Sequence, residues 1–214
     1  MVRDPKVNLV PRFLPRSVQT RNLLARAAAI GLLAGGLVAC SSNPIPTFDL
    51  SAPNHFSAGG GGAGIMVVVV PTALSALDTE KILVEPAPGQ ITYLSDAQWA
   101  DRLPALLQAR TIQAFENGSK LRRVARPSDG VTGDYQLTMD IRTFGVQVRP
   151  SGPQGVVELS AKVIAIATGR IVAAQVFVAE VPLSGTTGPA VASGLDQASN
   201  EVLLKIVRWA SARF

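Results

Sequence analysis

Residues 135–149 have the sequence YQLTMDIRTFGVQVR, and residues 157–181 have the sequence VELSAKVIAIATGRIVAAQVFVAEV. Apolar and polar side chains alternate along both stretches, which is typical of strands with one buried face. Thr168-Gly169 interrupts the second stretch and predicts a tight turn between two paired strands. The apolar phase shifts near Arg142-Thr143, which indicates a β-bulge. We therefore expect three long strands in this region.

Shorter strands are predicted before this region. Residues 65–70 form a continuous apolar run, as expected for a strand buried on both faces. Residues 81–85 predict a second strand, and residues 121–125 a weaker one. Residues 89–95 are interpreted as a loop or a brief edge strand.

Two helices complete the pattern. Asp96 is a plausible N-cap for a helix that continues to about Asn117-Gly118, and Pro104 inside it predicts either a kink or a later start. Ile112 points away from the apolar stripe of this helix. A second helix is predicted over residues 191–213. Its apolar stripe consists of Val191, Leu195, Ala198, Val202, Ile206 and Trp209.

This order of elements predicts an α+β two-layer sandwich, with a mainly antiparallel sheet and two main helices packed on one face. Leu203, Leu204 and Val207 lie outside the stripe of the last helix. They belong either to a wide buried face or to a partner surface. We take them, with the segment Gly89–Ser95, as candidates for a partner interface.

The charge of the chain is unevenly distributed. Residues 1–39 contain six Arg or Lys residues and one acid, whereas residues 40–214 contain fourteen of each sign. The mature chain therefore has no basic excess that would indicate nucleic-acid binding. The basic start is followed by the uncharged residues 27–38, which are too short for a spanning helix and typical of a cleaved secretory signal.

The apolar stretch ends in Leu37-Val38-Ala39-Cys40, which resembles the lipobox of bacterial lipoproteins. The resemblance implies S-diacylglycerol on Cys40, cleavage before it and N-acylation of the new amine. Ser41 resembles the sorting position of lipoproteins sent to the outer membrane. The alternatives are an ordinary signal peptide with an incidental cysteine, or an uncleaved anchor. A later start codon would leave the mature chain unchanged.

The predicted organisation has three parts. Residues 1–39 are the removed signal peptide, residues 40–64 are the lipidated cysteine with a Pro/Gly-rich tether, and residues 65–214 are the folded domain. Phe48-Asp-Leu50 could dock as a short edge strand. Gly59–Gly64 fits G-x-G-x-x-G, but it precedes a strand instead of following one, so it does not predict a dinucleotide site.

The residues do not predict catalytic chemistry. The single histidine, His55, lies in the predicted tether, and the single cysteine is assigned to lipid. Asp96 and Asp101 point to different sides of a helix, while Asp140 and Glu158 could meet across strands without forming more than a solvated face. We expect no enzyme activity, no metal site and no cofactor apart from the covalent lipid.

Several segments together resemble the ABC-type transport auxiliary lipoproteins, which include the PqiC group. The segments are DAQWADRLP (96–104), QAFEN (113–117), DYQL (134–137) with DIR (140–142), and Ala161-Lys162 leading to Gly169-Arg170. The resemblance covers most of the mature chain, from Phe48 to Trp209. It implies a non-catalytic partner of MCE-type ABC systems, which move lipids or other hydrophobic molecules between membranes. The chain would then be anchored in the outer membrane and face the periplasm.

Two other hypotheses stay open. A stand-alone lipid or small-molecule carrier would need an apolar cavity between sheet and helices. Small residues could leave such room: Ala161, Ala165, Ala167, Ala173 and Ala174. A structural assembly factor would instead bind a β-barrel protein of the outer membrane. Cargo, transport direction and any homo-oligomer are not determined by these residues.

Overall fold

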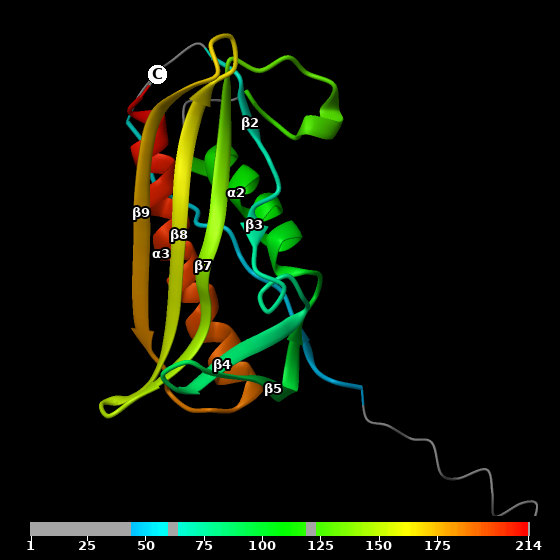
Figure 1. The fold of residues 1–214 in the computed structure, drawn as a ribbon, viewed down its shortest axis with the longest axis vertical. Coiled ribbons are helices and arrows are strands. Elements are labelled where there is room, and N and C mark those ends of the chain that lie inside the picture. Colours follow the sequence, from blue (N-terminus) through cyan, green and yellow to red (C-terminus); the bar gives the residue numbers. More distant parts are fainter. Residues whose placement is uncertain (1–43, 60–63, 119–122, 214) are drawn as a thin grey trace, which may run out of the picture. The chain divides into compact units, whose positions relative to one another are not determined.

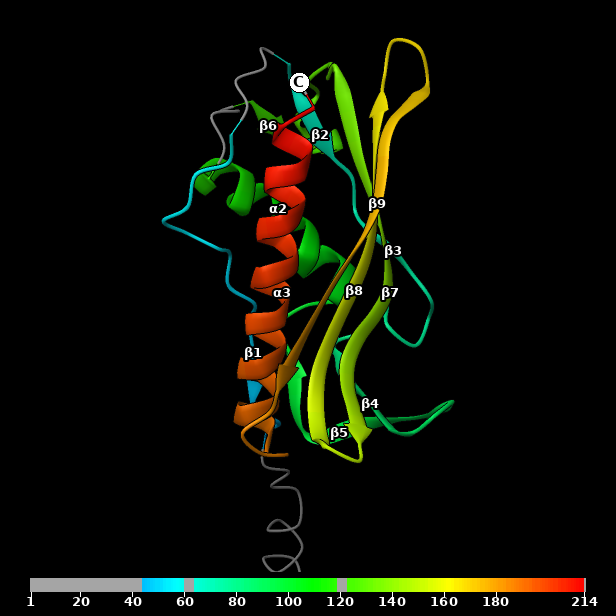
Figure 2. The ribbon, with the colours of Figure 1, turned by 90° about the vertical axis from the view of Figure 1, so that its left-hand side faces the viewer.

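A computed structural model describes residues 44–59, 64–118 and 123–213. In this part of the chain, nine strands form one sheet, and two α-helices pack against it (Figure 1). The strands are β1 Thr47–Phe48, β2 Met66–Val68, β3 Thr72–Ala73, β4 Lys81–Ala87, β5 Gln90–Trp99, β6 Val124–Ala125, β7 Tyr135–Arg149, β8 Gly152–Ala165 and β9 Arg170–Pro182. The helices are α2 Leu103–Gly118 and α3 Gly188–Ser211, and Pro127–Asp129 form a short 3₁₀ turn. Figure 2 shows α2 and α3 on the same side of the sheet, so the predicted α+β class is confirmed.

The three long strands are where the alternation predicts them. β7 pairs with β8 and β8 pairs with β9, both in antiparallel register. The register of β7 shifts between Ile141 and Thr143, which confirms the predicted bulge. Gly169 has a φ of 67° in the turn between β8 and β9, a conformation that glycine adopts without strain.

The short strands make the sheet mixed. β4 and β5 form an antiparallel hairpin, whereas β2, β3 and β4 each pair with β7 in parallel. β1 pairs in parallel with β5, at an edge of the sheet, so the short edge strand expected around Phe48 is present. The sheet is therefore antiparallel along its long strands and in the β4–β5 hairpin, and parallel where β2, β3 and β4 meet β7.

The expected helix start at Asp96 is wrong. Residues 90–99 form β5, and α2 begins at Leu103, with Pro104 in its first turn, where a missing N–H costs nothing. The helix therefore has the later start that was predicted as one of the two effects of Pro104. Trp99 ends β5 and packs edge to face on Phe144, with ring centroids 5.8 Å apart. Asp96 instead accepts a hydrogen bond from the backbone N–H of Gly188, the first residue of α3 (3.0 Å).

The expected tether over residues 40–64 is also wrong for its described part. The compact unit begins at Ile45, and Leu50 and Ala58 are buried in the core. Asp49 forms an ion pair with Arg110 of α2, and the N–H of Ala58 donates to the carbonyl of Gly118 (2.7 Å). Apolar side chains and specific polar partners outweigh the Pro-rich composition here. Residues 40–43 and 60–63 lie outside the described residues.

Candidate functional site

The proposed lipidation site cannot be placed in the fold. Cys40 and Ser41 lie outside the described residues, which begin at Pro44. Within the described ranges, no helix is both long and apolar enough to cross a bilayer.

The proposed partner surface on α3 needs correction. Leu203 and Val207 have no exposed surface, because α3 packs against both the sheet and α2 and the two side chains belong to the core. The wide-buried-face interpretation is therefore right for these two residues. Leu204 is half-buried and lines a surface groove. Ile112 of α2, expected to point away from the stripe, is also buried.

The groove beside Leu204 lies between α3 and the N-terminal segment. Its volume is about 460 Å³, and Pro53, Asn200 and Lys205 also line it. Asp196, another lining residue, accepts hydrogen bonds from the backbone N–H and the hydroxyl of Ser51, at 2.6 and 2.7 Å. These contacts hold the N-terminal segment at one wall of the groove. The sequence analysis did not predict that this N-terminal segment packs on the domain. The apolar residues Phe48, Leu50 and Phe56 are the signal that could have indicated it.

The segment Gly89–Ser95 belongs to the β4–β5 hairpin instead of a loop. A hollow of about 170 Å³ lies beside the hairpin, and Leu74, Leu83, Ile91 and Phe144 are among the residues that line it. Leu74 and Ile91 are exposed by 76% and 55%. This hollow is apolar, but it accommodates about one large side chain.

The alanines proposed to leave a cavity do not line one together. Ala161 is fully buried against the helices, whereas Ala165 and Ala173 are half-buried and Ala167 and Ala174 are exposed. Four of the five therefore do not lie in the closed layer between sheet and helices. This placement removes the sequence argument for a carrier cavity.

The charged groups of the sheet form separate ion pairs. Glu158 faces Thr143 in the register and pairs with Arg142 (3.2 Å), so it does not meet Asp140, whose strand partner is Ser160. Asp140 instead accepts a hydrogen bond from Thr72 (3.0 Å). Asp140 and Glu158 therefore do not form a pair of neighbouring carboxylates.

Arg149 of β7 and Glu180 of β9 form a two-bond ion pair at 2.7 and 2.8 Å. These hydrogen bonds lower the pKa of Glu180 below its ordinary value and raise the pKa of Arg149. The pair joins the two outer strands of the β7–β8–β9 unit across β8.

His55 is exposed and has a φ of 53° in the N-terminal segment. Within the described ranges, no group of three or more His, Cys, Asp or Glu side chains is placed to hold a metal ion. Three surface features of the described residues could contact another molecule: the groove beside Leu204, the hollow beside Ile91 and the edges of the sheet.

Residues 47–207 match the family of the ABC-type transport auxiliary lipoprotein component. The chain belongs to this family. The match begins at β1, which agrees with the folded segment before Gly59. It also confirms the resemblance drawn from the sequence.

Two known proteins illustrate the similarity. An uncharacterised protein of Bradyrhizobium diazoefficiens is 30% identical over 165 residues, which cover 76% of this chain and 44% of that protein. The chain thus spans less than half the length of this curated relative. The crystal structure of a Xanthomonas campestris protein assigned to the DUF330 family has a TM-score of 0.71 and 27% identity, and the match covers 78% of this chain and 95% of that one. A further uncharacterised structure, at a TM-score of 0.61 and 14% identity, shares the fold.

Proposed function

We propose that the chain is a non-catalytic auxiliary subunit of an MCE-type ABC transport system that moves lipids or other hydrophobic molecules between membranes. The family match over residues 47–207 carries this proposal, because the family is an ABC transport auxiliary component. In this proposal the subunit binds an MCE-domain protein and the ABC subunits.

We further propose that Cys40 carries an S-diacylglycerol and an N-acyl chain and that Ser41 directs the protein to the outer membrane, facing the periplasm. Three acyl chains exceed the two membrane signals that stable anchoring needs. Because the compact unit begins at Ile45, four residues (41–44) lie between it and Cys40, which makes five residue-to-residue steps along the chain. An extended chain spans roughly 3.5 Å per residue, so the domain would be held within about 18 Å of the anchor.

The anchoring proposal is tested with the full-length chain and its Cys40→Ser variant in the native host. Metabolic labelling with an alkyne fatty acid should mark the wild type and not the variant. Density fractionation should place the wild type with outer membranes and release the variant. Labelled protein in inner-membrane fractions would contradict the sorting role of Ser41, and an unlabelled wild type would contradict lipidation.

The transport proposal is tested by affinity purification of the anchored protein from detergent-solubilised envelopes. Recovery of an MCE-domain protein with ABC subunits is the expected result. Recovery of a β-barrel protein alone would favour the assembly-factor hypothesis. Recovery of lipid alone, in a defined stoichiometry, would favour a carrier.

A further inference from the structure

β9 forms a free edge of the sheet. Its single strand partner among the described residues is β8, and α3 packs behind the pair. Figure 1 shows β9 as the outermost of the three long strands. With Arg170–Pro182 it offers a long row of backbone groups on the side away from β8.

The strand itself carries little protection against strand pairing. Residues 171–179 contain neither a charged residue nor a proline. Val176 and Val178 are exposed by 39% and 41%, and Ile171 near the start of the strand by 58%. One irregularity lies at the start of β9, where the register with β8 shifts between Val163 and Ile164. An exposed, extended and apolar edge of this kind favours the addition of another strand.

The orientation of the edge follows from one contact. The amine of Lys205 donates a hydrogen bond to the carbonyl of Val178 (2.9 Å), so this carbonyl points away from β8. Both backbone polar groups of a strand residue point to the same edge, and those of its neighbours to the other edge. The N–H and C=O of Val176 therefore also face the free edge, while Phe177 turns its side chain into the core.

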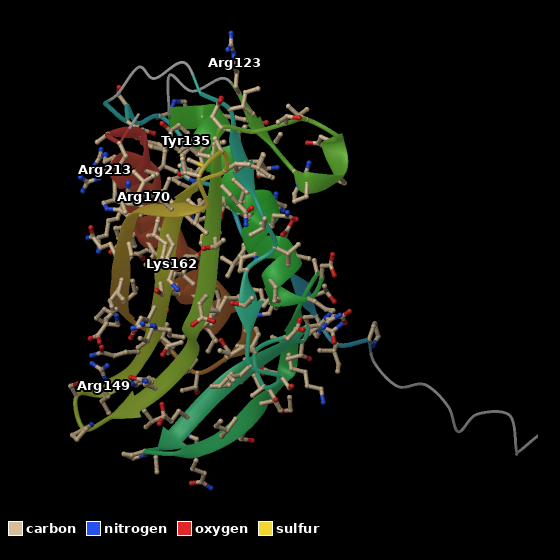
Figure 3. The ribbon with its side chains drawn as sticks, turned by 45° about the horizontal axis from the view of Figure 1, so that its top comes forward. Arg123, Tyr135, Arg149, Lys162, Arg170 and Arg213 are labelled. Atoms are coloured by element: carbon tan, nitrogen blue, oxygen red, sulfur yellow. The ribbon has the colours of Figure 1, made fainter. Side chains whose placement is uncertain are left out.

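Basic side chains surround this edge. Lys162 lies on β8 opposite Ala174, Arg170 begins β9, and Lys205 and Arg208 lie on the exposed side of α3. Figure 3 shows Lys162 and Arg170 along β8 and at the start of β9. No ion pair involves any of these four residues within the described ranges.

Most acidic side chains near this edge already form ion pairs. Glu158 and Glu180 pair with Arg142 and Arg149, while Glu201 lies one turn before Lys205. Two copies joined edge to edge would bring their basic groups together, which is unfavourable. The charge therefore favours an acidic occupant over a second copy.

We propose that the free edge of β9 is a docking site for an extended, acidic segment of a partner protein, which adds to the sheet as a strand. The backbone groups of Val176 and Val178 bind the segment, and the basic side chains select its charge. The segment displaces Lys205 from the carbonyl of Val178. This inference depends on neither the lipid anchor nor the transport assignment.

The first test uses the full-length chain in detergent micelles and a fluorescent nine-residue peptide of alternating valine and threonine with glutamate at both ends. The matched peptide has lysine at both ends. We expect the acidic peptide to bind at least about tenfold more tightly, since several like charges oppose the other. Hydrogen exchange should slow at the backbone N–H groups of Val176 and Val178.

The second test changes the edge. Val176→Pro removes the N–H that faces away from β8 and should weaken acidic-peptide binding by up to about tenfold, as expected for the loss of one hydrogen bond. Val176→Glu, which places a negative charge beside the acidic peptide and should also weaken its binding, serves if the proline variant melts early. Arg170→Glu should weaken binding, whereas Arg126→Glu, outside β9 and α3, should not.

Three outcomes would overturn the proposal. They are equal affinity for the two peptides, no binding of either, and exchange protection confined to residues outside β9. Self-association in sedimentation that Val176→Lys abolishes would assign the edge to a second copy instead. The peptide assay contains no transporter subunit and measures no anchoring, so its failure is distinct from failure of the proposed function.

Discussion

Ser51 and Asp196 are 145 residues apart in the sequence, yet two hydrogen bonds join them: the backbone N–H of Ser51 donates to Oδ1 (2.6 Å) and its hydroxyl to Oδ2 (2.7 Å). Asn200 also donates to the hydroxyl of Ser51 (2.6 Å). This cluster ties the start of the compact unit to α3.

Asp196→Ala should loosen the N-terminal segment. Hydrogen bonds to a charged acceptor contribute about 1–2 kcal/mol at a partly exposed site, so the free energy of unfolding should fall by roughly that amount. Limited proteolysis should cleave between residues 51 and 58 faster than in the wild type. Glu116→Gln, at an exposed residue of α2, is the control and should change neither quantity. Unchanged proteolysis in Asp196→Ala would contradict the anchoring role of this cluster.

Leu203→Ala and Leu204→Ala should differ strongly. Leu203 is fully buried, so its truncation should lower the free energy of unfolding by about 2–5 kcal/mol. Leu204 is half-buried, and its truncation should cost less than about 1 kcal/mol. Urea denaturation of both variants measures the difference. Equal costs would mean that α3 does not turn the Leu203 side chain into the core.

Gly145→Ala should destabilise the junction of β4 and β7. A Cβ at Gly145 would lie 2.5 Å from the carbonyl oxygen of Leu83, its partner in the parallel register, so the strands would have to separate. We expect a loss of about 1–3 kcal/mol, measured by thermal unfolding. Gly59→Ala, where no atom lies within 4 Å of the added Cβ, is the matched control. A stable Gly145→Ala protein would contradict the close approach of the two strands.

The Arg149–Glu180 pair should make stability depend on pH. Its hydrogen bonds lower the pKa of Glu180 in the folded state. Its contribution is therefore complete above the pKa of the unfolded carboxyl and is lost as the pH falls through the lower folded pKa. The difference in unfolding free energy between the wild type and Glu180→Gln should be present at pH 7 and disappear in acid. A difference that grows as the pH falls would reverse the predicted sign.

The sequence by itself determined the elements whose signals are local. Alternation along β7, β8 and β9 specified three strands with one buried face, and the phase shift near Arg142 specified the bulge. The apolar stripe of α3 could also be predicted, because a helix places every third or fourth residue on the same side. The family resemblance rested on the same segments and is confirmed by the match over residues 47–207.

Only the tertiary structure decided which residues near these elements are buried, paired or free. Aspartate is a residue type that often caps the N-terminus of a nearby helix, which is why Asp96 was expected to begin one. In the structure Asp96 lies in β5 and accepts a hydrogen bond from the N–H of Gly188, 92 residues away, at the start of α3. Leu203 lies outside the ideal stripe but is buried, because α3 packs against α2 as well as against the sheet and a wide face of the helix is covered. The Pro-rich segment before Gly59 is folded because Leu50 and Ala58 are buried in a core that residues later in the chain form. These outcomes depend on long-range burial and hydrogen bonding, which a local pattern of residues does not contain.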